Sequence, residues 1–91
     1  MLILLSSMLF VVINMTAFQR IKDLREDRDL NQTQVGELLG INQNSYSRYE
    51  RGAQPFPVHH LIALAQFYGT SIDYLVGLTD DPIPPKRKRV K

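Results

Sequence analysis

The 91-residue sequence contains no cysteine. This absence excludes disulfides, thiolate metal sites and cysteine nucleophiles, and it is compatible with a reducing compartment. We therefore expect a cytoplasmic protein. A chain of this length has room for one small domain with a compact core, so any functional site must be built into that domain.

Signatures of catalysis and metal binding are also lacking. There is no glycine-rich phosphate loop, and no serine, histidine and aspartate show the spacing of a nucleophile elbow or a catalytic triad. His59 and His60 are adjacent, so on a helix they diverge by about 100° and cannot chelate one metal together. We expect both at the surface or at a helix start. The sequence predicts no enzyme, cofactor, metal or small-molecule substrate.

Long apolar runs are confined to residues 1–14, which carry no charged side chain. As a helix, Leu2 to Ile13 would be about 18 Å long against a hydrocarbon core of roughly 30 Å, too short to cross a bilayer. A secretory signal would need a basic start and a small-x-small cleavage site, and neither is present. We favour upstream sequence translated from a start site assigned too early. An apolar extension at a dimer interface and an interfacial membrane anchor stay open.

Positive charge is scarce in the body of the chain and concentrated at its end. Met15 to Asp81 contains six Lys/Arg and nine Asp/Glu, a net charge of −3, whereas Lys86 to Lys91 adds five positive charges. A negative body cannot hold nucleic acid by bulk attraction, so binding needs locally placed donors. We divide the chain into an apolar extension (1–14), a domain (15–79), and a proline-rich linker with a basic tail (80–91).

The 15–79 region predicts five short helices and no sheet, because apolar residues recur at helical spacing and no segment alternates with period two. The first helix is expected from Ala17 to Arg28. The expected N-terminal caps are Thr16 with Gln19, Asn31 with Gln34, Asn42 and Ser71, and Pro57 is expected as the first residue of the fourth helix. Gly40, Gly52, Gly69 and Gly77 are expected to end the second, third, fourth and fifth helices. The expected buried residues are Phe18, Ile21, Leu24, Val35, Leu38, Leu39, Leu61, Ile62, Leu64, Ala65, Phe67, Ile72, Leu75 and Val76.

The predicted third helix has two chemically different faces. At about 100° per residue, one face collects Gln43, Asn44, Ser47 and Arg48, while Tyr46 and Tyr49 fall on the opposite side. Gln or Asn can pair bidentately with adenine and Arg with guanine, so this outward face suits the DNA major groove. An ordinary solvated face would have a similar composition. The preceding helix and the tight Gly40-Ile41-Asn42 turn favour a helix-turn-helix.

The stretch LREDRDLNQTQVGELLGINQNSYSRYERG, followed by GTSIDYLVGLTDDP, resembles the Cro and lambda-repressor type of helix-turn-helix proteins, often called the XRE family. The resemblance covers roughly residues 17–81. Its landmarks are Leu24-Arg25, Asn31-Gln32, Gly40, Glu50 with Gly52, and Gly69 before Ser71. It implies a compact, all-α, five-helix domain that binds double-stranded DNA. We expect a sequence-specific transcriptional regulator, a repressor that binds a roughly palindromic operator as a homodimer.

The resemblance also implies roles for single residues. The base contacts would come from Gln43, Asn44, Ser47 and Arg48, the DNA backbone contacts from Gln32, Thr33, Arg51 and Gln54, and an internal ion pair from Arg25 and Glu50. Two departures stand out. Gly36 lies where the family often has alanine, at a cost of about 1 kcal/mol in helix stability. Tyr46 and Tyr49 replace aliphatic residues, so their hydroxyls need water or a partner.

A second hypothesis from a different class stays open. The same fold could serve an antitoxin-like or adaptor subunit that binds a protein partner, with DNA binding secondary. The apolar residues 1–14 would be its strongest support.

The basic tail PPKRKRVK resembles a nuclear-import signal in composition, but we interpret it as an arm that adds nonspecific phosphate contacts. Deleting Lys86 to Lys91 should weaken DNA binding and lower the salt slope by about 0.9 for each phosphate that the tail neutralises. Sequence preference should not change. Titrations of one duplex at several salt concentrations measure the slope, and an altered base preference would contradict this interpretation.

Overall fold

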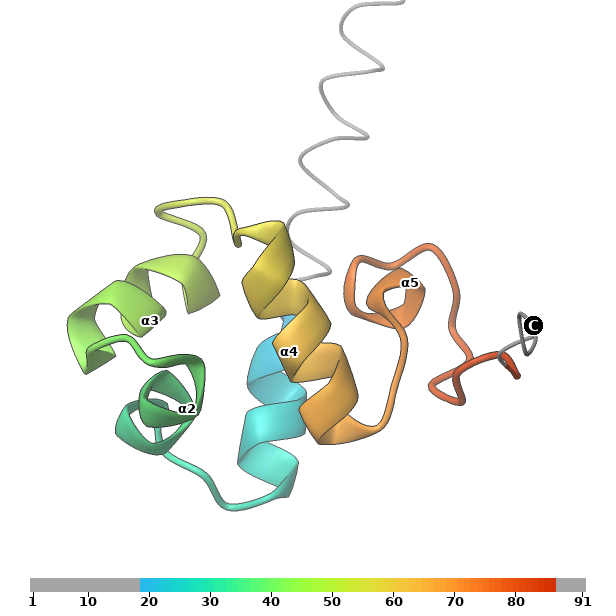
Figure 1. Cartoon of the computed structure of the whole chain (residues 1–91), viewed down its shortest axis with the longest axis horizontal. Helices are drawn as coiled ribbons and strands as arrows, with labels where there is room; N and C mark the ends of the chain where they lie inside the picture. Colours follow the sequence, from blue (N-terminus) through green and yellow to red (C-terminus); the bar gives the residue numbers. More distant parts are fainter. Residues whose placement is uncertain (1–18, 87–91) are drawn as a thin grey trace, which may run out of the picture.

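The computed structural model describes residues 19–86. In this range the chain forms five helical segments and no strand: residues 19–27, α2 (Gln32–Leu39), α3 (Gln43–Glu50), α4 (Val58–Tyr68) and α5 (Ile72–Leu75) (Figure 1). The predicted all-α, five-helix fold is confirmed. The predictions for Thr16, Ala17, Phe18 and residues 1–14 lie outside the described residues.

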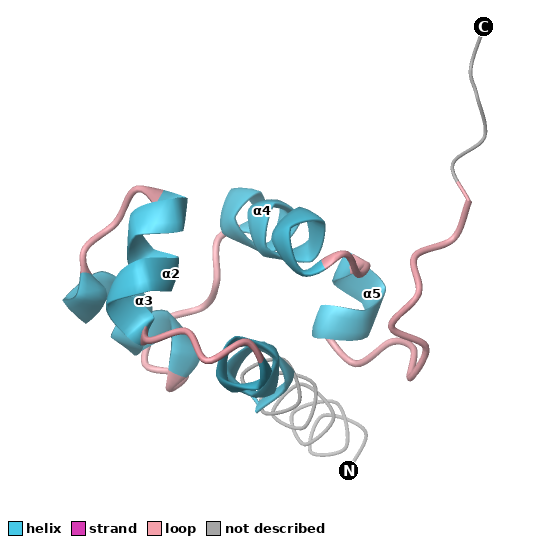
Figure 2. Ribbon diagram, turned by 90° about the horizontal axis from the view of Figure 1, so that it is seen from below, coloured by secondary structure: helices cyan, strands magenta, loops and turns pink. Residues whose placement is uncertain are grey.

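The helices are arranged around a small core. Figure 2 shows α2 and α3 together at one end of the domain and α5 at the other. Between the two ends, α4 runs along one side and the helix of residues 19–27 along the opposite side. As a result, α3 lies at the periphery, with one of its sides facing away from the rest of the protein.

Side-chain caps fix where the helices begin. The Asn31 side chain accepts from the Gln34 backbone N–H at 2.8 Å, and the Gln34 side chain accepts from the Asn31 N–H at 2.8 Å, which completes the predicted capping box. Asn42 accepts from the Ser45 N–H at 2.8 Å and Ser71 from the Tyr74 N–H at 3.0 Å. All three predicted caps are confirmed, and each satisfies an amide that the helix itself leaves free.

Left-handed glycines end α2 and α4 as predicted, with φ of 72° at Gly40 and 68° at Gly69. Three other bounds were predicted less accurately. α3 ends at Glu50 and α5 at Leu75, so Gly52 and Gly77 each follow the last helical residue by two positions. Pro57 is the N-cap of α4 and not its first helical residue. In α3 and α5 a C-cap residue, Arg51 or Val76, stands between the last helical residue and the glycine.

The core joins all five helical segments. Its fully buried side chains are Ile21, Val35, Tyr46, Leu64 and Leu75, with Ala65 and Tyr68 almost as deeply placed. Leu24, Leu39, Leu61 and Ile72 pack against this cluster. Burial of each such side chain contributes on the order of 1.5–3 kcal/mol, so a domain of this size depends on all of them.

Three burial predictions are wrong. Ile62 and Phe67 lie on the outer side of α4 with 42 % and 38 % of their surface exposed, and Leu38 on α2 is 48 % exposed. His60 lies in the first turn of α4, one of its two expected positions, but it is buried. The sequence of α4 contains no charged residue, so no charged face indicates which side of the helix points outward. On α2 the buried positions are taken by Val35 and Gly36, which leaves Leu38 exposed.

Arg20 holds the segment after α5 against the body of the domain. Its guanidinium donates to the carbonyls of Tyr74 and Thr79 and pairs with Asp80 at 2.6 Å. The Thr70 hydroxyl donates to the Pro82 carbonyl at 2.6 Å. The proline-rich segment, expected as a linker, is thus bonded to the domain as far as Pro82. No helix among residues 19–86 is both long and apolar enough to cross a bilayer.

The core assignment predicts different outcomes for two leucines. Leu64→Ala should cost about 2–5 kcal/mol in unfolding free energy, because a fully buried side chain is lost and a cavity remains. Leu38→Ala is the matched control and should cost about 1 kcal/mol or less, because half of that side chain is already in water. Urea titrations of both variants measure the difference. Equal losses would show that the burial pattern is wrong.

Candidate nucleic-acid interface

The outward side of α3 carries the residues predicted to contact bases. Gln43, Asn44 and Arg48 are exposed and Ser47 is half-buried. The sequence-based rotation of this helix is therefore correct. An exposed row of amides and a guanidinium on a peripheral helix is chemically able to pair with base edges.

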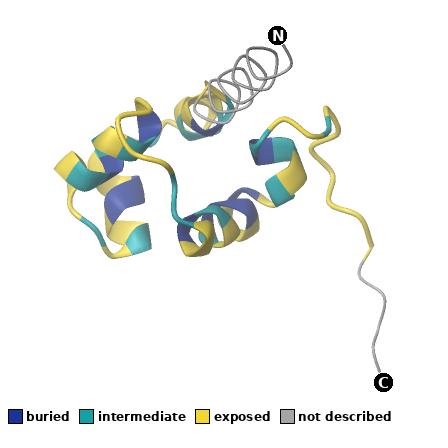
Figure 3. Ribbon diagram, turned by 90° about the horizontal axis from the view of Figure 1, so that it is seen from above, coloured by how far each residue is buried: buried dark blue, intermediate teal, exposed yellow. Residues whose placement is uncertain are grey.

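The opposite side of α3 anchors the helix to the domain. Tyr46 is completely buried and meets the Phe56 ring edge-on, with ring centroids 6.3 Å apart. Tyr49 stacks on Phe56 with ring centroids 5.4 Å apart. Figure 3 shows the contrast between the buried and exposed sides of the helices. Aromatic packing on this scale fixes the rotation of α3 about its own axis.

A missing side chain at position 36 lets the turn approach α2 closely. A Cβ at Gly36 would lie 3.0 Å from the carbonyl oxygen of Ile41, tighter than ordinary contacts allow. The same turn is closed by the Ile41 N–H, which donates to the Gly36 carbonyl at 2.9 Å. The glycine that departs from the resembled family therefore has a packing role here.

A bidentate ion pair ties the first helix to the end of α3, as the resemblance implied. Arg25 Nε lies 2.9 Å from Glu50 Oε2 and Arg25 Nη2 lies 2.8 Å from Glu50 Oε1. A third N–H of Arg25 donates to the Leu30 carbonyl at 2.9 Å. Both side chains are shielded, with 11 % of Arg25 and 4 % of Glu50 exposed.

The charged form of Glu50 is favoured by its neighbours. Burial by itself raises the pKa of the Glu50 carboxyl, but hydrogen bonds from Arg25 and Gln32, with the Tyr46 hydroxyl nearby, hold the pKa below its usual value. The same pair raises the pKa of Arg25. The carboxylate is consequently a hydrogen-bond acceptor throughout the neutral range.

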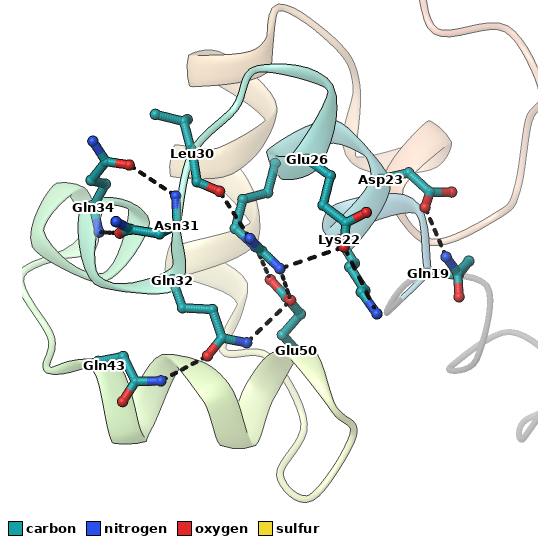
Figure 4. Close-up of polar contacts among 11 residues, drawn as sticks. Gln19, Lys22, Asp23, Glu26, Leu30, Asn31, Gln32, Gln34, Gln43 and Glu50 are labelled. Atoms are coloured by element: carbon teal, nitrogen blue, oxygen red, sulfur yellow. Dashed lines mark hydrogen bonds and ion pairs between the residues drawn. The ribbon is translucent and has the colours of Figure 1, made fainter.

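Glu50 also orients an exposed amide on α3 through Gln32 (Figure 4). Gln32 Nε2 donates to Glu50 Oε1 at 3.3 Å, and Gln43 Nε2 donates to Gln32 Oε1 at 2.8 Å. Because a carboxylate can only accept, Gln32 must turn its nitrogen to Glu50 and its oxygen to Gln43. The buried pair thereby determines which end of the Gln43 amide remains free.

The residues predicted to contact the DNA backbone lie at two helix ends. Thr33 is exposed and Gln32 half-buried in the first turn of α2, while Arg51 and Gln54 are exposed beyond α3. The N–H groups of Ala53 and Gln54 both donate to the Arg48 carbonyl, at 2.9 and 3.2 Å. This loop therefore folds back onto the end of α3. Contacts of these four residues with phosphates stay a prediction.

Two tyrosine hydroxyls are enclosed in the core. Those of Tyr46 and Tyr68 are buried and make no hydrogen bond of good geometry within residues 19–86. The Tyr46 hydroxyl, expected to need a hydrogen-bond partner, thus has none of good geometry among these residues. Burial beside Glu50 raises the pKa of Tyr46 far above its ordinary value. Burial and Glu50 also raise the pKa of Tyr68, to about 12. Both rings remain neutral and act as core side chains.

Three polar contacts were missed by sequence reasoning. The first is the hydrogen bond between Gln32 and Gln43, and the second is the set of bonds by which Arg20 holds the segment after α5. The third is made by Arg28, which donates to the carbonyls of Phe67 and Tyr68 at the end of α4. Each joins residues at least eleven positions apart, so no local pattern reveals them. The pairing of an amide with Gln32 could have been suspected from its place beside the predicted ion pair.

The two neighbouring histidines lie closer together than a helical wheel suggests. The ring centroids of His59 and His60 are 4.1 Å apart, and burial lowers the pKa of His60. Between residues 19 and 86, no group of three or more His, Asp or Glu side chains is arranged to hold a metal.

A family model described as "Helix-turn-helix" matches residues 21–75, which run from within the first helix to the end of α5. No solved structure matches the chain significantly.

Curated relatives show the same similarity. The chain is 42 % identical over 74 residues to the uncharacterized HTH-type transcriptional regulator YobD of Bacillus subtilis, covering 80 % of this chain and 66 % of the relative. It is 41 % identical over 69 residues to the cryptic phage CTXphi transcriptional repressor RstR of Vibrio cholerae, covering 76 % and 62 %. It is 34 % identical over 59 residues to the antitoxin PezA of Streptococcus pneumoniae, covering 65 % and 37 %. The chain thus spans less than two thirds of the length of these relatives.

The ion pair predicts a specific dependence of stability on pH. The folded pKa of Glu50 lies below its unfolded value near 4.5, so the stabilisation by ionised Glu50 is complete above that value. It should be lost as the pH falls from about 4.5 toward the lower folded pKa. Urea titrations between pH 7 and pH 3 should show a smaller acid-induced loss for Glu50→Gln than for the parent.

Removing the cation should be more damaging. Arg25→Ala strands a buried carboxylate and should cost about 3–5 kcal/mol at pH 7. Lys22→Ala is the control, because Lys22 and Glu26 form an exposed pair at 3.8 Å worth about 0–1 kcal/mol. An Arg25→Ala protein that melts at the parent temperature would refute the structural role of the pair.

Proposed function

This chain belongs to the helix-turn-helix family, and on that premise we propose that it is a sequence-specific, DNA-binding transcriptional regulator. It acts in the cytoplasm as a repressor, through occlusion of a promoter and without a chemical step. The observation that carries the proposal is the exposed row of Gln43, Asn44 and Arg48 on a helix whose other side is locked into the core. The name of the relative RstR supports repression.

Base reading follows from the hydrogen-bonding capacity left on α3. The bond to Gln32 uses one N–H of Gln43 and leaves its oxygen and second N–H, which is the acceptor and donor pair that adenine requires. Arg48 is exposed and can make the bidentate contact that guanine offers in the major groove. Asn44 and Ser47 complete the set on neighbouring base pairs.

Backbone contacts position the reading helix. The side chain of Asn31 caps the Gln34 N–H, so the backbone N–H groups of Gln32 and Thr33 in the first turn of α2 are free to bind a phosphate. Arg51 and Gln54 would meet the sugar-phosphate backbone beyond the other end of α3. Such local donors are needed because the body of the chain has a net negative charge.

We propose that two copies act together. A two-fold axis would place two α3 helices in successive major grooves about 34 Å apart, so the operator would be roughly palindromic. Residues 15–79 would form the DNA-binding domain of each copy.

A second candidate function is favoured by the similarity to the antitoxin PezA. On this alternative the chain binds a protein partner and DNA binding is secondary. Purification of the chain with a stable partner in fixed stoichiometry, together with no duplex enrichment, would favour it over the first proposal.

Selection of duplexes from a random pool by the full chain tests the function directly. The parent should enrich one roughly palindromic sequence. Arg48→Ala should lose about 1–3 kcal/mol of binding free energy and relax preference at one base position of each half-site.

Arg51→Ala serves as the comparison. It should weaken binding to all duplexes about equally and reduce the salt slope by about 1, as expected when one fewer phosphate is neutralised. A parent protein that enriches no sequence would overturn the proposed function.

A further inference from the structure

The segment around α4 is unusual in having no charge. No Asp, Glu, Lys or Arg occurs between Arg51 and Asp73, a stretch that contains the whole of α4. Elsewhere the first helix carries several charged residues, α2 carries Glu37, and α3 carries Arg48. α4 is thus the one long helix among the described residues without a charged side chain.

The outer side of α4 is uncharged and carries exposed apolar side chains. His60, Leu64, Ala65 and Tyr68 are its buried residues and face the core. On the other side Val58 is 67 % exposed and Ile62, one turn later, is 42 % exposed. His59 and Gln66 complete an exposed, uncharged stripe along the helix. Neighbouring apolar side chains on an exposed helix face with no charged residue are typical of a surface that another protein covers.

The position of this stripe leaves the proposed DNA-binding surface free. In Figure 2, α4 runs along one side of the domain, between the end formed by α2 and α3 and the end formed by α5. A protein packed on the outside of α4 would therefore lie beside α3 and would not cover its exposed row.

We propose that the α4 stripe, formed by Val58, His59, Ile62 and Gln66, is the surface through which two copies of this chain associate. This inference rests on the proposed function, which requires a two-fold dimer. In a two-fold interface the same patch meets itself, so each charge in the patch approaches its own copy. Like charges brought together in this way oppose association, and a charge-free stripe avoids that cost.

The two most exposed apolar side chains of the described residues are less suited to self-association. Leu78 is 68 % and Ile83 74 % exposed, but they lie among Asp73, Asp80 and Asp81. Two copies meeting there would bring these carboxylates toward one another. On charge alone, the α4 stripe is the better site for a second copy.

Sedimentation equilibrium of the full chain tests the surface. The parent should be a dimer, whereas Val58→Asp and Ile62→Asp should be monomers with unchanged helical circular dichroism. Val58→Asp guards against misfolding, because that side chain is the more exposed of the two. Leu78→Asp is the matched control and should remain a dimer. A monomeric parent, dimeric α4 variants, or a Leu78→Asp protein that is monomeric like the α4 variants would overturn the inference.

DNA binding separates this inference from the function on which it rests. With the duplex enriched by the parent, Ile62→Asp should bind the palindrome about 100-fold or more weakly, because two linked half-sites no longer act together. Its affinity for a single half-site and its base preference should match those of the parent. If the parent enriches no duplex but the α4 variants still convert dimer to monomer, the surface stands and the proposed function falls. Unchanged affinity of Ile62→Asp for the palindrome would overturn the surface alone.

Discussion

The pairing of Arg25 with Glu50 is the interaction on which the rest of the domain depends. It joins the first helix to the last turn of α3 through two short hydrogen bonds in a shielded position. A third N–H of Arg25 fixes the loop before α2 at Leu30. One guanidinium therefore holds together three segments that are separated in the sequence. The Glu50 carboxylate also accepts a hydrogen bond from Gln32. An ionic contact in the interior thereby determines how an amide is presented on the surface.

Local features of the fold were predictable from the sequence because the physics behind them is local. The caps Asn31, Asn42 and Ser71 and the left-handed Gly40 and Gly69 each act within a few residues. The rotation of α3 was also predictable, since amides and tyrosines separate cleanly on a helical wheel. The ion pair came from the resemblance and not from spacing, because the partners are twenty-five positions apart.

The features that could not be predicted are those set by tertiary contacts. The rotation of α4 is ambiguous in a sequence without charge, so Ile62 and Phe67 were placed inside, whereas packing exposes them and buries His60. The hydrogen bonds from Arg20 to Thr79 and Asp80 join residues about sixty positions apart, so no periodic pattern in the sequence reveals them. For the candidate site, the sequence located the exposed residues, but the direction of the Gln43 amide required the whole chain of contacts to Glu50.

The close approach at Gly36 has a consequence for the start of α3. The carbonyl that a methyl group at this position would press upon belongs to Ile41, and Asn42, the cap of α3, follows directly. A side chain at position 36 would therefore press on the turn that leads into α3, from the buried side of the domain and away from the exposed row. The absence of a Cβ at this single position thus sets how closely the start of α3 can approach α2.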